Sequence, residues 1–156
     1  MKKVKEIDSD AAFGICQVSS WESHYEEGEK HLERFAAARD FSADIILLRF
    51  IENCPKDTFD RETFLEETRK VLAFLDPEKK SQFIVTTGFW RHPGDDALRD
   101  LSRELSAPLA ELGDLGEQPE MKALGLFEHR GVSVHPGDLG MEKIAERIFE
   151  KMTALL

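Results

Sequence analysis

The chain has 156 residues, the usual length of one domain, and its 41% hydrophobic and 33% charged residues are typical of a folded globular protein. This composition excludes a disordered or collagen-like chain. Asp and Glu number 31 against 21 Lys and Arg, and the net charge of -10 disfavours nucleic acid and anionic membrane surfaces as partners. Residues 1–10 lack the apolar run of a secretion signal, so we expect a single cytoplasmic domain over residues 1–156.

Short apolar runs alternate with helical patterns along the chain. The runs predicted as buried strands are 13–18 (FGICQV), 43–50 (ADIILLRF), 83–88 (FIVTTG) and, more weakly, 108–112. Helical periodicity predicts helices over 22–39, 60–75 and 95–105, and a last helix that packs on the sheet and extends from its expected N-cap, Asp138, to the C-terminus. The two cysteines, Cys16 and Cys54, are expected to be buried free thiols.

This alternation predicts an α/β fold, in which parallel strands joined by right-handed crossovers form an open sheet with helices on both faces. Ligands of such sheets bind at the carboxyl ends of the strands. We therefore expect functional residues in 51–55, in 89–92 and in the loop before the last helix.

A histidine lies in that last loop, where 131–141 has the sequence GVSVHPGDLGM. The stretch from His135 to Met141 resembles the last conserved block of the SGNH, or GDSL-type, hydrolases, a family of esterases and lipase-like enzymes. In that family the catalytic histidine precedes the C-terminal helix. The resemblance implies a three-layer, flavodoxin-like fold and assigns His135 as the general base.

A second correspondence lies at 49–53 (RFIEN), which is similar to the G-x-N block at the end of the family's third strand. Asn53 occupies the place of the asparagine that helps to form the oxyanion hole. The segments 86–90 (TTGFW) and 20–22 (SWE) also resemble one bacterial branch, so the resemblance extends from about Phe13 to Met152.

The resemblance implies hydrolysis of small-molecule esters, including acyl groups on carbohydrates, without a metal or an organic cofactor. In that chemistry a serine attacks the ester carbonyl, His135 takes the serine proton, and the Asn53 amide stabilises the developing oxyanion. A histidine suits the base because its unperturbed pKa lies near 6.5, and one preorganised oxyanion donor lowers the barrier by about 3–4 kcal/mol.

The family's nucleophile block, Gly-Asp-Ser or Gly-Asn-Ser after the first strand, is not seen in this chain. The serines nearest to the expected place are Ser9, Ser19, Ser20 and Ser23. Ser9 has no preceding apolar strand and no glycine, and Ser19, Ser20 and Ser23 lie where the family's second block should be. Ile51 stands where the family has the glycine of G-x-N, and 18–21 (VSSW) has no counterpart of the second block's glycine.

The acid partner of His135 is left open. The family usually has an acid three residues before the histidine, where this chain has Val132. A backbone carbonyl, Glu128 or Asp138 could orient the imidazole instead.

The missing block would also remove a central strand next to 13–18. We considered three explanations: that 13–18 pairs with 43–50, that it pairs across a homodimer, or that a segment upstream completes the sheet.

These residues allow other functional interpretations. Cys54 could act as a nucleophile with His135, and His92, His129 and His135 could bind zinc, although no metal-ligand spacing supports this. We expected 91–94 (RHPG) to be a solvated turn and Trp21, Phe89 and Trp90 to serve mainly in packing. The alternative to an esterase is a non-catalytic remnant that serves in binding or assembly.

Overall fold

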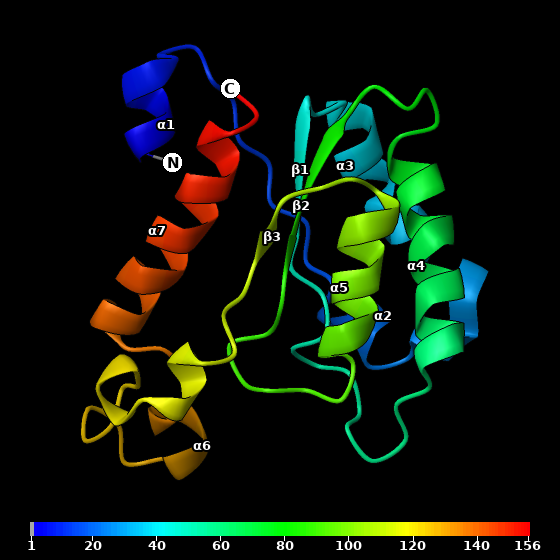
Figure 1. The fold of residues 1–156 in the computed structure, drawn as a ribbon. Helices are drawn as coiled ribbons and strands as arrows, with labels where there is room; N and C mark the ends of the chain where they lie inside the picture. The colour runs from blue at the N-terminus through cyan, green and yellow to red at the C-terminus, as the bar shows by residue number, and fades with distance from the viewer. Residues whose placement is uncertain (1) are drawn as a thin grey trace.

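The sheet has three parallel strands in the order β1-β2-β3 (Figure 1). The computed structural model describes residues 2–156. The strands are β1 (Ile45–Leu48), β2 (Gln82–Thr86) and β3 (Leu109–Ala110). Ile45 lies opposite Gln82, and Val85 lies opposite Leu109. The expected α/β class and three of the four expected strands are confirmed.

Helices cover both faces of the sheet, as Figure 1 shows with α7 on one side and α4 and α5 on the other. Their bounds are α4 (Arg61–Leu75), α5 (Asp95–Glu104) and α7 (Asp138–Thr153). Each face has its own buried cluster. The α4 and α5 side is centred on Phe64, Val85 and Leu101, and the α7 side on Leu112 and Ile144. Such burial is the main source of stability, at about 25 cal/mol per Å² of apolar surface.

The predicted helix boundaries are largely correct for α4 and α5. Asp60 caps α4, because its carboxylate accepts a hydrogen bond from the Thr63 backbone N–H at 2.7 Å. The expected cap of α7 is wrong, because Gly137 is the N-cap residue. Asp138 is the first residue of the helix, and no side chain forms a capping hydrogen bond there. As a first-turn acid, Asp138 still interacts favourably with the helix dipole.

The predicted strand over 13–18 is wrong, because these residues form no strand and pair with nothing in the sheet. Only Cys16 and Val18 pack against the core, while Ile15 is 89% exposed. An extended segment that places alternate side chains against a core has the same sequence pattern as a strand. Pairing of this segment with 43–50 is therefore excluded, whereas pairing across a homodimer stays a prediction.

The single helix predicted over 22–39 is also wrong. The region contains α2 (Ser19–Glu22), a 3₁₀ segment (Tyr25–Phe35) and α3 (Ala36–Phe41). Gly28 interrupts it with φ of 57°, and a Cβ there would lie 2.6 Å from Glu67 Oε2 of α4. Only glycine permits both this backbone and this close approach.

The remaining elements are short. They are α1 (Lys2–Ile7), the 3₁₀ turns Leu115–Glu117 and Pro119–Met121, and α6 (Arg130–Ser133). Among the described helices, none has the length and apolar character needed to cross a membrane.

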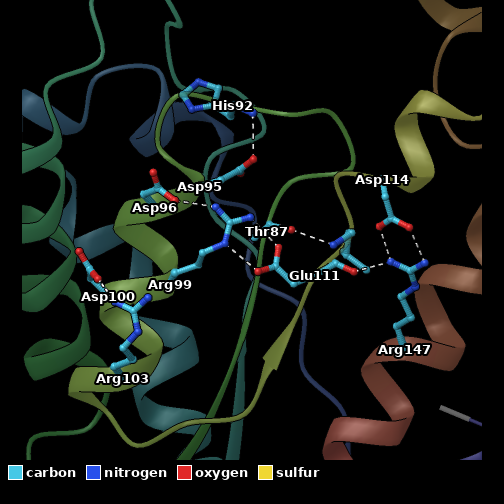
Figure 2. A network of polar contacts seen from close by, with 11 residues as sticks. Thr87, His92, Asp95, Asp96, Arg99, Asp100, Arg103, Glu111, Asp114 and Arg147 are labelled. Carbon is cyan, nitrogen blue, oxygen red and sulfur yellow. Dashed lines mark hydrogen bonds and ion pairs between the residues drawn. The ribbon is translucent and has the colours of Figure 1, made fainter.

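A polar network connects the helices to the segment that follows β3 (Figure 2). Arg99 of α5 donates two hydrogen bonds to the Glu111 carboxylate, at 2.7 and 2.8 Å. From the other face, Arg147 of α7 binds the Asp114 carboxylate and lowers the pKa of that group. Because bidentate arginine pairs have a defined geometry, this clamp sets the relative positions of α5, α7 and the end of β3.

His92 connects the loop after β2 to the loop after β1. Its Nε2 donates to the Cys54 carbonyl at 3.1 Å, and its Nδ1 accepts from the Gly94 backbone N–H at 2.9 Å. A turn is present at Pro93 and Gly94, and Arg91 and Pro93 are exposed as expected, but His92 is only 7% exposed, so the expectation of a solvated turn holds only in part. Burial lowers the pKa of His92, because it disfavours the charged imidazolium.

We expect the free energy of unfolding to fall as the pH drops below about 6.5, because the unfolded chain then binds a proton at His92 that the folded chain does not. Urea unfolding at several pH values measures this slope. In the His92→Asn variant the slope should be smaller, whereas His129→Asn, at an exposed histidine, should keep it. An unchanged slope in His92→Asn would show that His92 does not titrate as described.

Candidate functional site

A pocket of about 300 Å³ lies at the carboxyl edge of the sheet. It is lined by residues of the loops that follow β1 and β2, of the loop before α7 and of the first turn of α7: Arg49, Glu52, Asn53, Phe89, Trp90, His135, Pro136 and Met141. The structure thus brings together Asn53 and His135, the two site residues predicted from the sequence.

The His135 ring is held in one orientation by its own loop. Its Nδ1 lies 2.8 Å from the Gly131 carbonyl oxygen, which can only accept a hydrogen bond, so Nδ1 carries the proton. In the neutral ring, this tautomer leaves Nε2 with its lone pair, which a general base requires. Trp90 meets the ring edge-on, with 4.9 Å between ring centroids and an interplanar angle of 89°.

The partner of His135 Nδ1 is therefore a backbone carbonyl, that of Gly131. No hydrogen bond joins His135 to Glu128 or Asp138, two of the partners left open by the sequence. Backbone carbonyls leave no side-chain signature, which is why the sequence could not single out this one.

The loop that carries His135 is closed at its base. Lys122 and Pro136 form an antiparallel bridge, and the Ala123 N–H donates to the His135 carbonyl at 2.9 Å. The Gly137 N–H donates to the Met121 carbonyl at 2.9 Å. These bonds anchor the histidine backbone beside the first turn of α7.

Glu52 connects the ends of β1 and β2 at the pocket. Its Oε1 accepts hydrogen bonds from the Phe89 N–H and from an Arg49 Nη2–H, both at 2.9 Å. The carboxylate neutralises Arg49 and fixes the backbone beside Trp90.

Asn53 is held by Glu22, a residue whose role the sequence did not reveal. The Asn53 Nδ2 donates to Glu22 Oε2 at 2.6 Å, and Glu22 is only 1% exposed. Because Nδ2 carries two protons, one remains for a ligand in the pocket. Burial raises the pKa of the Glu22 carboxyl, and its Oε1 has no partner among the described residues.

The backbone that leads to Asn53 is strained. Ile51 has φ of 96°, a conformation that β-branched residues rarely adopt. Its side chain is fully buried between two glycines: a Cβ would lie 2.5 Å from Ile51 Cδ1 at Gly94 and 3.1 Å from Ile51 Cγ2 at Gly88. Packing thus offsets the strain, which is of order 1–3 kcal/mol for such residues.

No serine lines this pocket in the described chain, residues 2–156. Ser9 is exposed and contacts only Asp10. Ser23 is nearest to the site, but its hydroxyl bonds the backbone carbonyls of Ser19 and Asn53, at 3.0 and 3.5 Å. The structure therefore places none of the four candidate serines beside His135.

The Cys54 alternative lacks what it requires. Burial raises the pKa of its thiol, with the Glu22 charge as a further cause, so the reactive thiolate is disfavoured. Cys54 does not line the pocket that contains His135. Both cysteines are free thiols, with Cys54 buried and Cys16 half-buried.

The three histidines weighed as zinc ligands form no metal site in the described chain, where no group of three or more His, Cys, Asp or Glu side chains is suitably placed. Both ring nitrogens of His92 are already engaged with backbone groups.

The aromatic residues near the site differ in burial and in their contact with the pocket. Trp21 and Phe89 are each 1% exposed, and Trp21 packs against Phe50 and Phe64. Trp90 alone of the two tryptophans lines the pocket.

A second hollow, of about 380 Å³, lies at the start of α5. Its arginines are already paired, Arg91 with Glu117 and Arg99 with Asp96 and Glu111. It therefore has fewer polar groups free to bind a ligand than the pocket at Asn53 and His135.

Comparison with protein-family models, with characterised proteins and with solved structures gives no match to this chain. What the structure defines is an α/β domain with a pocket at the carboxyl edge of a parallel sheet, lined by both polar and apolar side chains.

We expect Gly94→Ala to lower the free energy of unfolding by about 1–3 kcal/mol, because the new Cβ overlaps Ile51 Cδ1 and Phe59 Cζ. Ile51→Val removes Cδ1 and should recover part of this loss in the double variant. Gly113→Ala is the matched control, since its nearest contact would be 3.4 Å. Urea denaturation of the parent and the four variants measures these losses, and additive losses in the double variant would contradict the packing described.

We expect Glu22→Gln to be more stable than the parent at neutral pH. The raised pKa of Glu22 means that ionisation weakens the fold as the pH rises above about 4.3, and glutamine cannot ionise. The difference should shrink as the pH falls toward 4.3. Glu26→Gln, at an exposed position, removes the same charge and is the control for the loss of one carboxylate. A Glu22→Gln variant that is less stable at neutral pH would contradict the cost assigned to this carboxylate.

Proposed function

We propose that the pocket hydrolyses carboxylic esters, with acyl groups on small molecules or carbohydrates as the substrate class. His135 is the general base, and Asn53 donates to the oxyanion. The observation that carries the proposal is that these two residues, far apart in sequence, line one pocket, with the His135 tautomer set for proton transfer.

The described residues can promote attack of a water molecule on the ester carbonyl. His135 Nε2 takes a proton as the water oxygen bonds to the ester carbonyl carbon. The carbonyl oxygen becomes an oxyanion that accepts the free Nδ2–H of Asn53. Collapse of the tetrahedral intermediate breaks the bond to the alkoxy group, which leaves with the proton from His135, so the products are an acid and an alcohol.

The proposed function also implies a more specific fold than the α/β class. We propose an SGNH-type, flavodoxin-like arrangement, in which β1 corresponds to the family's third strand and Asn53 to its G-x-N asparagine. The support is the order of the segments: Asn53 follows β1, the 86–90 segment ends β2, and His135 precedes α7. A cytoplasmic location and a reaction without cofactor complete the proposal.

A non-catalytic binding domain is the second candidate. It is favoured by the lack of a serine among the residues that line the pocket. Such a domain would bind an ester or an acylated carbohydrate through Asn53 and Trp90 without turnover.

The test is hydrolysis of a short-chain chromogenic ester by the purified chain. We expect His135→Ala to abolish turnover and Asn53→Ala to lower kcat by about 100-fold, the usual effect of removing one oxyanion donor. His129→Ala, at an exposed histidine on the same loop, should retain full activity. Parent rates in the His135 and Asn53 variants would exclude the proposed roles.

Intact mass after treatment with a fluorophosphonate separates the two nucleophiles. Turnover without an adduct supports attack by water. A stoichiometric adduct would contradict it and identify a serine nucleophile. Binding of the ester without turnover or adduct would favour the non-catalytic domain.

A further inference from the structure

Half of the large apolar side chains that are exposed in the described chain lie between residues 124 and 141. We call them the apolar rim: Leu124, Leu126, Phe127, Val132, Leu139 and Met141. Their exposed fractions range from 40% to 69%. Soluble proteins seldom expose such clusters unless a ligand or partner covers them.

The rim is continuous with the pocket. The bridge between Lys122 and Pro136 closes the loop that carries four of the six rim residues, and His135 lies at its base. Met141 belongs to both, since it lines the pocket and is 52% exposed. A ligand whose carbonyl lies between Asn53 and His135 can therefore extend directly onto the rim.

The charge of this loop differs from that of the rest of the chain. Between residues 122 and 136 it has Lys122 and Arg130 against a single carboxylate, Glu128, while the chain as a whole has a net charge of -10. The loop thus lacks the acidic surface that keeps the remainder solvated, and an apolar chain can lie on it without desolvating many carboxylates.

We propose that the apolar rim binds the hydrocarbon chain of the substrate, so that the pocket takes esters of medium- and long-chain acids. The choice of an acyl chain as occupant rests on the proposed ester hydrolysis. Its physical basis is the burial of methylenes against exposed leucine, phenylalanine and methionine side chains, which favours binding by about two- to fourfold for each methylene covered.

The test measures binding, so that it does not depend on turnover. Trp90 lines the pocket and the other tryptophan, Trp21, is 1% exposed, so tryptophan fluorescence reports the pocket. The probes are the neutral amides butyramide, octanamide and dodecanamide, which present a carbonyl and chains of increasing length. Trp90→Phe should lose the signal.

We expect affinity to rise with chain length in the parent protein, by at least about tenfold from butyramide to dodecanamide. The double variant Leu126→Ser/Phe127→Ser should bind butyramide as the parent does and lose most of that increase. Ile7→Ser is the matched control, because Ile7 is equally exposed, at 57%, but lies in α1 near the opposite end of α7 (Figure 1). The control should keep the full increase.

Equal affinity for the three amides, or an unchanged increase in the double variant, would overturn the proposal. So would self-association through the rim, which sedimentation would detect as a dimer that the double variant abolishes. Equal affinity for the three amides in a parent protein that shows His135-dependent turnover would overturn this inference alone. An affinity that rises with chain length in the parent, without His135-dependent turnover, would overturn only the proposed function.

Discussion

The turn that ends β1 is the constraint on which the pocket depends. Ile51 takes a left-handed backbone conformation, and the chain then presents Glu52 and Asn53 toward the loops after β2 and before α7. The strained residue stays in place because its side chain fills the space left by Gly88 and Gly94. In this way core packing on one side of the turn holds polar side chains on the other, which is how rigid scaffolds maintain local strain at sites.

A buried carboxylate completes the arrangement at an energetic cost. Glu22 is desolvated, has one oxygen without a partner in the described chain, and uses the other to orient the Asn53 amide. Buried charges that are not fully paired destabilise a fold, so their presence beside a pocket is typical of sites in which position matters more than stability. His135 is arranged more simply, by one hydrogen bond to the Gly131 carbonyl and by the edge-on contact with Trp90.

Much of the fold followed from periodicity. The runs at 43–50 and 83–88 and the helices α4, α5 and α7 have strong patterns, and the structure contains all of them. The segment 13–18 has an equally strong pattern but no neighbour to pair with, and 22–39 is broken at Gly28 by contact with α4. Both errors arise from tertiary contacts, which a local pattern does not contain. The motif resemblance pairs Asn53 with His135 across a long stretch of sequence, and the structure places both at one pocket. The contacts of Glu22 with Asn53 and of the Gly131 carbonyl with His135 depend on tertiary geometry, which the sequence pattern does not contain.

The central claim is that Asn53 and His135 act on one carbonyl. The most direct measurement is a ¹⁵N NMR titration that follows the Asn53 side-chain amide and the His135 ring nitrogens while octanamide is added. We expect both signals to shift with the same dissociation constant, and the His135 Nδ1 to remain the protonated nitrogen, as its bond to the Gly131 carbonyl requires. A shift of one residue without the other, or a proton on Nε2 in the free protein, would contradict the account.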